Sequence, residues 1–310
     1  MRISGLRPAG NFPAVPASHP RFPALPLLFL AALLFPTGVF PQEVGPANGS
    51  LVVVGGGMRD PAILERFIQL AGGPEAPIVV IPTAGGGESY DALYPGLRMF
   101  HELGAFNLTV LHTYDPEVAD TEAFVAPINA ANGVWFPGGR QWRLADAYLG
   151  TRTEEALWRL LDRGGVIGGS SAGATIQGSY LARGDTKTNT IMMGDHEEGF
   201  GFLKGTAIDQ HVLKRNRQFD LIEVMEAHPD LLGIGLDENT AIVVQGDQFE
   251  VIGETYVLIY DTQKTVGQGG RFYFLAPGDR FDLATREATR PGTAFRPVEG
   301  PRALPWPGGG

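Results

Sequence analysis

The chain has 310 residues, enough for one large α/β domain or two small ones, and 44% of them are hydrophobic, which favours a globular fold over disorder. Its 24 basic and 34 acidic residues give a formal net charge of −10. This acidic balance, without basic clusters, argues against nucleic acid and anionic membranes as partners. No cysteine is present, which excludes disulfides, thiolate catalysis and cysteine-based metal sites.

Residues 1–41 are predicted to be a secretory signal peptide rather than part of the fold. Three arginines precede the apolar run at 24–35, and no acidic residue occurs before Glu43. A basic segment followed by about a dozen apolar residues is the usual layout of such a signal, and this run is too short to span a bilayer. We expect cleavage between Thr37 and Gln42 and a secreted or periplasmic protein without further membrane contact. An uncleaved anchor is the alternative.

Strands and helices alternate in the first half of the remaining chain. The predicted strands are 51–54, 78–81, 108–111, 134–136 and 166–167, and the predicted helices are 61–71, 90–103, 121–131, 141–149 and 153–162. Continuously apolar strands separated by amphipathic helices predict a doubly wound, mostly parallel α/β sheet with helices on both faces. Ligands bind such sheets at the carboxyl ends of the strands, where glycine-rich loops follow three of the predicted strands.

The pattern changes after Gly184. Residues 185–204 are polar and glycine-rich and are predicted to form a long loop over the site, followed by a helix at 218–228. Short segments at 234–236, 241–244, 249–252, 256–260 and 271–275 predict an antiparallel C-terminal part. We therefore interpret 48–290 as one α/β domain and 291–310, which is rich in proline and glycine, as a disordered tail.

The segment Gly169-Ser-Ser-Ala-Gly173 lies between a predicted strand and a predicted helix. The form Gly-x-Ser-x-Gly in this position is typical of a nucleophile elbow, a strained turn that exposes one serine at the sheet edge. The two glycines fit because the backbones there approach too closely for a Cβ atom. The amide of Ala172, at a helix N-terminus, is placed to stabilise an oxyanion. An ordinary glycine-rich turn with surface serines is the alternative.

A serine nucleophile needs a base, and the base needs an acceptor that orients it. Five of the six histidines lie in the signal segment, in or beside early core elements, in the polar loop or at a helix end. The remaining one is His211, where a short apolar approach ends in polar residues. For the acid, Asp237 and Glu238 are neighbours on a predicted strand-end turn, and position alone does not choose between them.

Six segments, in the same order, resemble the cyanophycinase and dipeptidase E group of serine peptidases, which share the class I glutamine amidotransferase-like fold. The segments are Val53-Val-Gly-Gly-Gly57, Ile81-Pro-Thr-Ala84, Phe136-Pro-Gly-Gly-Arg-Gln141, Gly169-Ser-Ser-Ala-Gly-Ala174, Ile208-Asp-Gln-His-Val-Leu-Lys-Arg-Asn-Arg217 and Leu232-Gly-Ile-Gly-Leu-Asp-Glu238. The segments lie between residues 53 and 238, and the resemblance as a whole covers roughly residues 51–282 of this chain. The Asp-Gln-His segment and the Arg-x-Arg after it are more similar to cyanophycinases than to dipeptidase E.

The resemblance implies a serine-type exopeptidase that needs no metal or other cofactor. It implies Ser171 as the nucleophile, His211 as the base and Glu238 as the residue that orients the base. The oxyanion hole would be formed by the amides of Gly139 and Ala172. The substrate pocket would be lined by Gln141, Asp209, Gln210, Arg215 and Arg217.

Two residues depart from the family pattern. Arg140 stands where an acidic or amide residue is usual, and Asp220 stands where cyanophycinases often carry a further arginine. Both positions belong to the implied pocket, so they affect the choice of substrate more than the chemistry. For Asp220 the sequence leaves two roles open, since it would either hold an arginine of the substrate or repel its carboxylates.

The implied substrate is cyanophycin, a polyaspartate that carries an arginine on each side-chain carboxyl, cleaved to β-aspartyl-arginine. Arg215 and Arg217 suit it because guanidinium groups bind carboxylates in a bidentate manner, and the acidic surface suits its arginine ends. A solvated helix start is the alternative for both arginines. Short aspartyl or β-aspartyl peptides are the alternative substrates, and the sequence is also compatible with a homodimer.

Other functions compete with this interpretation. An α/β-hydrolase esterase shares the elbow but expects a histidine near the chain end, whereas the predicted C-terminal strands all follow the last histidine, His228. A dinucleotide-binding loop is suggested by the glycines at 55–57, but Asp60 stands at the last glycine position of that motif. A binding protein that keeps the pocket without turnover is the remaining alternative.

Overall fold

The computed structural model describes residues 43–264 and 270–291. The predicted signal peptide and all but the first residue of the predicted tail lie outside the described residues. Those two assignments stay predictions. Within the described residues the strands form one sheet of nine strands and a second sheet of five.

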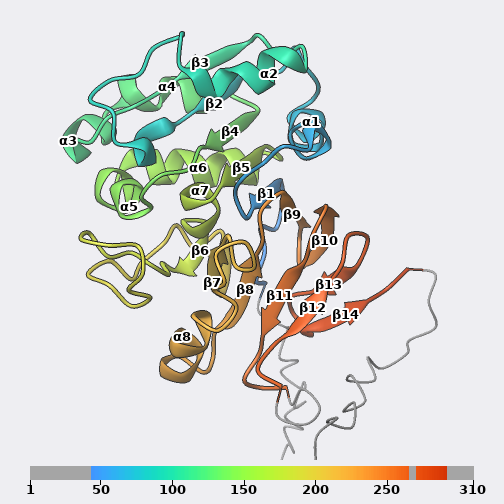
Figure 1. The fold of residues 1–310 in the computed structure, drawn as a ribbon. Helices are drawn as coiled ribbons and strands as arrows, with labels where there is room; N and C mark the ends of the chain where they lie inside the picture. The colour runs from blue at the N-terminus through green and yellow to red at the C-terminus, as the bar shows by residue number, and fades with distance from the viewer. Residues whose placement is uncertain (1–42, 265–269, 292–310) are drawn as a thin grey trace, which may run out of the picture. The chain divides into compact units, whose positions relative to one another are not determined.

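The nine-stranded sheet combines a parallel and an antiparallel part (Figure 1). Its strands are β1 Ser50–Val54, β2 Ile78–Val80, β3 Leu108–Val110, β4 Gly133–Phe136, β5 Val166–Ser170, β9 Thr240–Gln245, β10 Gln248–Gly253, β13 Arg280–Asp282 and β14 Glu287–Thr289. Their order is β14-β13-β10-β9-β1-β5-β4-β2-β3. The five neighbouring strands β1-β5-β4-β2-β3 pair in parallel, and β9 pairs antiparallel with β1. The predicted antiparallel C-terminal part is therefore confirmed.

Helices cover both faces of this sheet. They are α1 Pro61–Leu70, α2 Arg98–Glu102, α3 Pro116–Ala119, α4 Glu122–Ala130, α5 Trp142–Tyr148, α6 Arg152–Asp162 and α7 Ala172–Thr175, with 3₁₀ turns η1 Pro82–Gly85 and η2 Pro95–Leu97. A further helix, α8 Leu221–Ala227, packs against the second sheet. Val52 of β1 packs in the core that contains Phe67 of α1 and Phe100 of α2. Its neighbour Val53 belongs to the opposite core, which contains residues of α4, α5 and α6. Because successive strand residues point to opposite faces, both faces are apolar and both are covered, which confirms the doubly wound fold.

The second sheet was not anticipated as a separate layer. Its strands are β6 Gly178–Tyr180, β7 Leu203–Gln210, β8 Leu232–Leu236, β11 Val257–Tyr260 and β12 Tyr273–Leu275, in the order β12-β11-β8-β7-β6. Strands β6, β7 and β8 pair in parallel. His211 directly follows β7, and its amide donates to the carbonyl of Gly55 after β1 at 2.9 Å. The carboxyl ends of strands from both sheets therefore meet at one place.

The predicted helix at 90–103 is wrong in its first half, since only η2 and α2 form there, from Pro95 onward. Proline disfavours helical conformation in the residue before it and lacks an amide hydrogen. The preceding residues make local turns instead: the Leu93 amide donates to Asp91 Oδ1 at 2.8 Å, and the Gly87 amide donates to the Tyr90 hydroxyl at 2.7 Å. No helix of the described residues is both long enough and apolar enough to cross a membrane.

Candidate active site

Ser171 occupies the sharp turn between β5 and α7. Its backbone has φ +57° and ψ −112°, a conformation that costs a non-glycine residue on the order of 1–3 kcal/mol. A Cβ atom on Gly169 would lie 2.2 Å from the Gly173 carbonyl oxygen, and one on Gly173 would lie 2.0 Å from that of Phe136. Both positions therefore require glycine for the reason expected from the sequence. The turn leaves the Ser171 side chain only partly buried.

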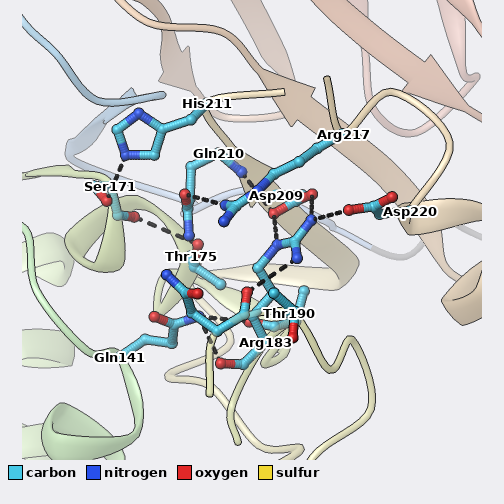
Figure 2. A network of polar contacts seen from close by, with 12 residues as sticks. Gln141, Ser171, Thr175, Arg183, Thr190, Asp209, Gln210, His211, Arg217 and Asp220 are labelled. Carbon is cyan, nitrogen blue, oxygen red and sulfur yellow. Dashed lines mark hydrogen bonds and ion pairs between the residues drawn. The ribbon is translucent and has the colours of Figure 1, made fainter. Parts of the chain in front are cut away.

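His211 lies between Ser171 and Glu238 and contacts both. Its Nε2 is 2.9 Å from the Ser171 hydroxyl, and its Nδ1 is 2.8 Å from Glu238 Oε1. A carboxylate only accepts hydrogen bonds, so Nδ1 carries the hydrogen and Nε2 presents a lone pair to the hydroxyl of Ser171. Figure 2 shows the contact between His211 and Ser171. The three residues come from the ends of β5, β7 and β8 and form one continuous chain of hydrogen bonds.

The environment of His211 favours its neutral form. The residue is 5% exposed, and burial lowers the pKa of its side chain from the ordinary value of 6.5. The hydrogen bond to Glu238 acts in the opposite direction, and the charges of Arg215 and Arg217 lower the pKa further. The net direction is downward, so the imidazole is a free base at neutral pH.

The geometry separates the two neighbouring acids that position alone left open. Glu238 contacts His211, whereas Asp237 faces the turn that follows His211. Asp237 Oδ1 accepts from the amides of Leu213 at 3.1 Å and Lys214 at 2.8 Å. Asp237 therefore holds the backbone of the segment that carries His211, and Glu238 holds the imidazole.

The glycines after β1 lie directly against this chain of hydrogen bonds. A Cβ atom on Gly56, at φ +112°, would lie 2.2 Å from His211 Cε1. On Gly57, at φ +50°, it would lie 2.4 Å from Glu238 Oε2. The glycine run that resembled part of a nucleotide-binding motif is thus explained by close packing against the base and the acid. The sequence analysis missed this role because the partners lie more than 150 residues away.

The loop after β4 lies beside Ser171. A Cβ atom on Gly138 would be 3.7 Å from Ser171 Oγ, and one on Gly139, at φ +147°, would lie 2.0 Å from the carbonyl oxygen of Ala84. Ala172 is the first residue of α7, where a helical amide has no partner within the helix. Among the hydrogen bonds within the described residues, neither the Gly139 amide nor the Ala172 amide is a donor. Both amides predicted to form the oxyanion hole are therefore available.

Two of the predicted pocket residues are engaged inside the protein. Asp209 is fully buried and forms a bidentate ion pair with Arg183, at 2.7 Å from Nε to Oδ1 and 2.9 Å from Nη2 to Oδ2. Gln141 is 1% exposed, and its Nε2 donates to the carbonyls of Ala182 and Arg183 at 2.8 and 2.9 Å. The donor group of Gln141 and both oxygens of Asp209 are therefore already hydrogen-bonded inside the protein.

Gln210, Arg215 and Arg217 are the predicted pocket residues with capacity left for a ligand. Arg217 is 8% exposed, and its Nη1 donates to Gln210 Oε1 at 3.3 Å. Burial, followed by the charge of Arg183, lowers the pKa of Arg217. Arg215 is exposed, and its amide donates to the His211 carbonyl at 2.9 Å. The two arginines thus lie on the turn that begins at the catalytic candidate His211.

The two departures from the family pattern both have partners within the protein. Arg140 Nη2 donates to the carbonyl of Asp185 at 2.6 Å and to that of Thr188. Asp220 Oδ2 accepts from Arg183 Nη2 at 2.7 Å. Arg183 therefore links Asp209 to Asp220, and the sequence analysis missed it. Nothing in its local sequence marks it, because its partners come from segments 26 and 37 residues further along the chain.

Comparison with known proteins agrees with this geometry. The pattern described as Peptidase family S51 matches residues 51–252. The chain belongs to this family. The resemblance to the cyanophycinase and dipeptidase E group is thereby confirmed, and the chain is a serine-type peptidase. Family membership also sets aside the α/β-hydrolase esterase and the nucleotide-binding protein.

Relatives of known name lie within the same group. The chain is 34% identical over 265 residues to a cyanophycinase of Nostoc sp. (strain PCC 7120), and this match covers 77% of the chain and 88% of the relative. It is 31% identical over 264 residues to a cyanophycinase of Geminocystis herdmanii, covering 77% and 96%. The crystal structure of a peptidase from an acI-B1 Actinobacterium matches with a TM-score of 0.58 and 26% identity, covering 77% of this chain and 98% of that one.

Proposed function

We propose that the protein is an exported cyanophycinase, which hydrolyses cyanophycin from a chain end through an acyl-enzyme on Ser171 and releases β-aspartyl-arginine. The observation that carries the proposal is the continuous hydrogen-bond chain from Ser171 through His211 to Glu238, placed beside two arginines. Arg215 and Arg217 are close enough to His211 for their charges to lower its pKa. The two cyanophycinase relatives support the same substrate.

In this proposal, His211 Nε2 takes the proton of the Ser171 hydroxyl while Oγ attacks the scissile carbonyl carbon. The negative charge on the carbonyl oxygen is stabilised by the amides of Gly139 and Ala172. His211 then gives its proton to the leaving amine, the carbon–nitrogen bond breaks, and Ser171 is acylated. Water, deprotonated by His211, attacks the acyl group and releases the product. Glu238 keeps the imidazole in the required tautomer and stabilises its protonated form.

Charge supports the choice of substrate. Each arginine attached to cyanophycin carries a free carboxylate and a guanidinium group, and the aspartate backbone has one free carboxylate at its end. Arg217 retains donors that are not used within the described residues, and a guanidinium binds a carboxylate with two parallel hydrogen bonds. The net charge of −10 attracts the arginine-rich periphery of the polymer. We infer that Arg215 and Arg217 bind free carboxylates of the substrate while the acidic surface increases the local concentration of polymer.

Export completes the proposal and rests on the sequence of residues 1–41 alone. A basic segment, an apolar run and the absence of acidic residues are typical of a cleaved signal. An enzyme outside the cytoplasm would act on polymer released by other cells. N-terminal sequencing of the protein recovered from the culture medium or periplasm tests this point, and a product that still begins at Met1 would contradict it.

The substrate is tested by incubating the mature protein with cyanophycin and identifying the soluble products by mass spectrometry. β-Aspartyl-arginine as the only early product is the expected result, because cleavage from a chain end releases single units. A ladder of longer oligomers would contradict the exopeptidase part of the proposal. Cleavage of short aspartyl or β-aspartyl peptides with no action on the polymer would replace the substrate and leave the serine mechanism in place.

A further inference from the structure

Arg183 joins three segments of the pocket wall through its backbone and its guanidinium (Figure 2). Its carbonyl accepts from Gln141, which follows the oxyanion loop. Its guanidinium binds Asp209 at the end of β7 in a bidentate manner and Asp220 on the turn before α8. The side chain of Arg183 is 1% exposed, that of Asp209 is fully buried and that of Asp220 is 38% exposed. One buried guanidinium thus binds one carboxylate that is buried with it and a second that reaches solvent.

A second arginine lies close to the same carboxylates without pairing with them. The charges of Asp209 and Asp220 raise the pKa of Arg217, while burial and the charge of Arg183 lower it, and the net direction is downward. In the described residues Arg217 forms no ion pair, and its guanidinium donates to the side chain of Gln210. Figure 2 shows Arg217 directed toward Gln210 while Arg183 is directed toward Asp209 and Asp220.

The two arginines therefore compete for one pair of carboxylates. A buried cation lowers its free energy by pairing with an anion, so an unoccupied Asp209 would attract Arg217 away from the position that it holds beside Gln210. With Arg183 in place, both oxygens of Asp209 and one oxygen of Asp220 are already bound, and the positive charge of Arg183 repels Arg217. The guanidinium of Arg217 is left with unused donors, which is the state that a ligand carboxylate requires.

We propose that Arg183 is a positioning residue for substrate specificity, which occupies Asp209 and Asp220 so that Arg217 stays available to the carboxylate of the substrate. This inference rests on the proposed function in one respect, namely that Arg217 binds a substrate carboxylate. It adds a residue that acts through Arg217 and does not itself touch the substrate. It also assigns Asp220 to holding Arg183 rather than to holding an arginine of the substrate.

The test compares Arg183→Met, Arg217→Ala and the double variant on a short soluble oligomer of β-aspartyl-arginine. Arg183→Met and Arg217→Ala should each raise KM roughly ten- to a hundredfold with little change in kcat, since a charge-assisted contact to substrate is lost in both. The double variant should be no worse than Arg217→Ala alone, because both changes remove the same contact. Arg183→Lys keeps the positive charge but loses the planar guanidinium that binds a carboxylate through two hydrogen bonds, so it should give an intermediate KM.

A serine-directed fluorophosphonate probe provides the control for folding and for the chemical machinery. The probe carries no carboxylate, so its rate of labelling Ser171, at a pH well above the His211 pKa, should be the same in the wild type and in Arg183→Met and Arg183→Lys. If Arg183→Met does not accumulate as folded protein, Arg183→Lys is used in its place, with KM for the oligomer and the labelling rate of Ser171 as the two measurements.

The outcomes separate this inference from the proposed function. An unchanged KM in the Arg183 variants alongside a raised KM in Arg217→Ala would overturn the inference alone. Equal losses of labelling and hydrolysis in the Arg183 variants would also overturn it, since a general structural role predicts that result. If the wild type cleaves neither the oligomer nor short aspartyl peptides, or if Arg217→Ala has no effect on KM, the role of Arg217 in the proposed function fails and the inference fails with it.

Discussion

Two clusters of side chains lie next to each other in this peptidase and differ in what they leave for a substrate. The Ser171 cluster (Ser171, His211 and Glu238) ends in a hydroxyl whose position is set by the turn after β5 and which can attack a ligand. In the Arg183 cluster (Arg183, Asp209 and Asp220) the guanidinium and both carboxylates are paired with one another. Asp209 and His211 are only two residues apart on the same strand end. Proximity to the reacting atoms therefore does not by itself make a residue a ligand for substrate.

The difference has a physical cause. A buried charge must be paired inside the protein, whereas a nucleophile must keep its reactive atom unshielded. We therefore expect substitutions in the Ser171 cluster to reduce turnover and substitutions in the Arg183 cluster to reduce stability or substrate binding. The predictions below test this division, from the largest expected effect to the smallest.

Ser171→Ala should lower kcat by at least about 10⁴-fold, because the acylated atom is removed while the rigid turn is kept. Hydrolysis of a peptide substrate measures the loss, and thermal unfolding should show a nearly unchanged midpoint. Ser170→Ala is the matched control, since Ser170 ends β5 and forms none of the side-chain contacts of the cluster. A Ser171→Ala protein with full activity would remove Ser171 from the mechanism.

Glu238→Gln should lower kcat by about 10²- to 10⁴-fold, because the amide no longer holds the imidazole in the required tautomer or stabilises its charged form. Asp237→Asn should retain most of the activity, since its amide oxygen can still accept from Leu213 and Lys214. Steady-state kinetics on both variants measure the contrast. The opposite ranking would show that the acid has been assigned to the wrong residue.

Asp209→Asn should lower the free energy of unfolding by about 3–5 kcal/mol, because the buried Arg183 loses one of its two anionic partners. Urea unfolding of the mature chain measures the change. Glu122→Gln breaks an exposed ion pair with Arg152 and should change stability by less than about 1 kcal/mol. Similar losses in the two variants would mean that burial does not distinguish the Arg183 cluster from the surface.

Gly56→Ala should lower kcat by about 10²-fold, because the new Cβ atom would displace the His211 ring from its position beside Ser171. Gly73→Ala is the matched control, since Gly73 has a similar φ of +101° but a Cβ atom there would meet nothing within 4 Å beyond its chain neighbours. It should destabilise the protein by about 1–3 kcal/mol and leave kcat unchanged. Equal effects of the two substitutions on kcat would attribute the loss to backbone strain alone.

The smallest effect concerns pH. The imidazole of His211 must be neutral to accept the proton, so kcat/KM should fall about tenfold per pH unit once the pH drops below the His211 pKa. Because burial lowers this pKa, the fall should begin below pH 6.5. Arg215→Gln removes a nearby positive charge and should shift the fall toward higher pH. A pH profile that falls from well above pH 6.5 would contradict a buried, neutral base.

The fold class and the reacting residues could be predicted from the sequence because their signals are local. Apolar strands and amphipathic helices of recognisable period indicated the doubly wound sheet, and the five residues around Ser171 carry their own conformational requirements. The structure places the predicted Ser171, His211 and Glu238 in one chain of hydrogen bonds. Their catalytic roles stay predictions until the variants above are measured.

What the sequence left open depends on contacts between distant segments. The choice of Glu238 over Asp237 follows from which carboxylate the turn between β8 and β9 directs toward His211. The engagement of Asp209 by Arg183 follows from the second sheet, which brings β6 and β7 side by side. A sequence shows which charges a chain contains, but whether a charge is paired inside the protein or left for a ligand is decided only when the tertiary structure excludes water around it.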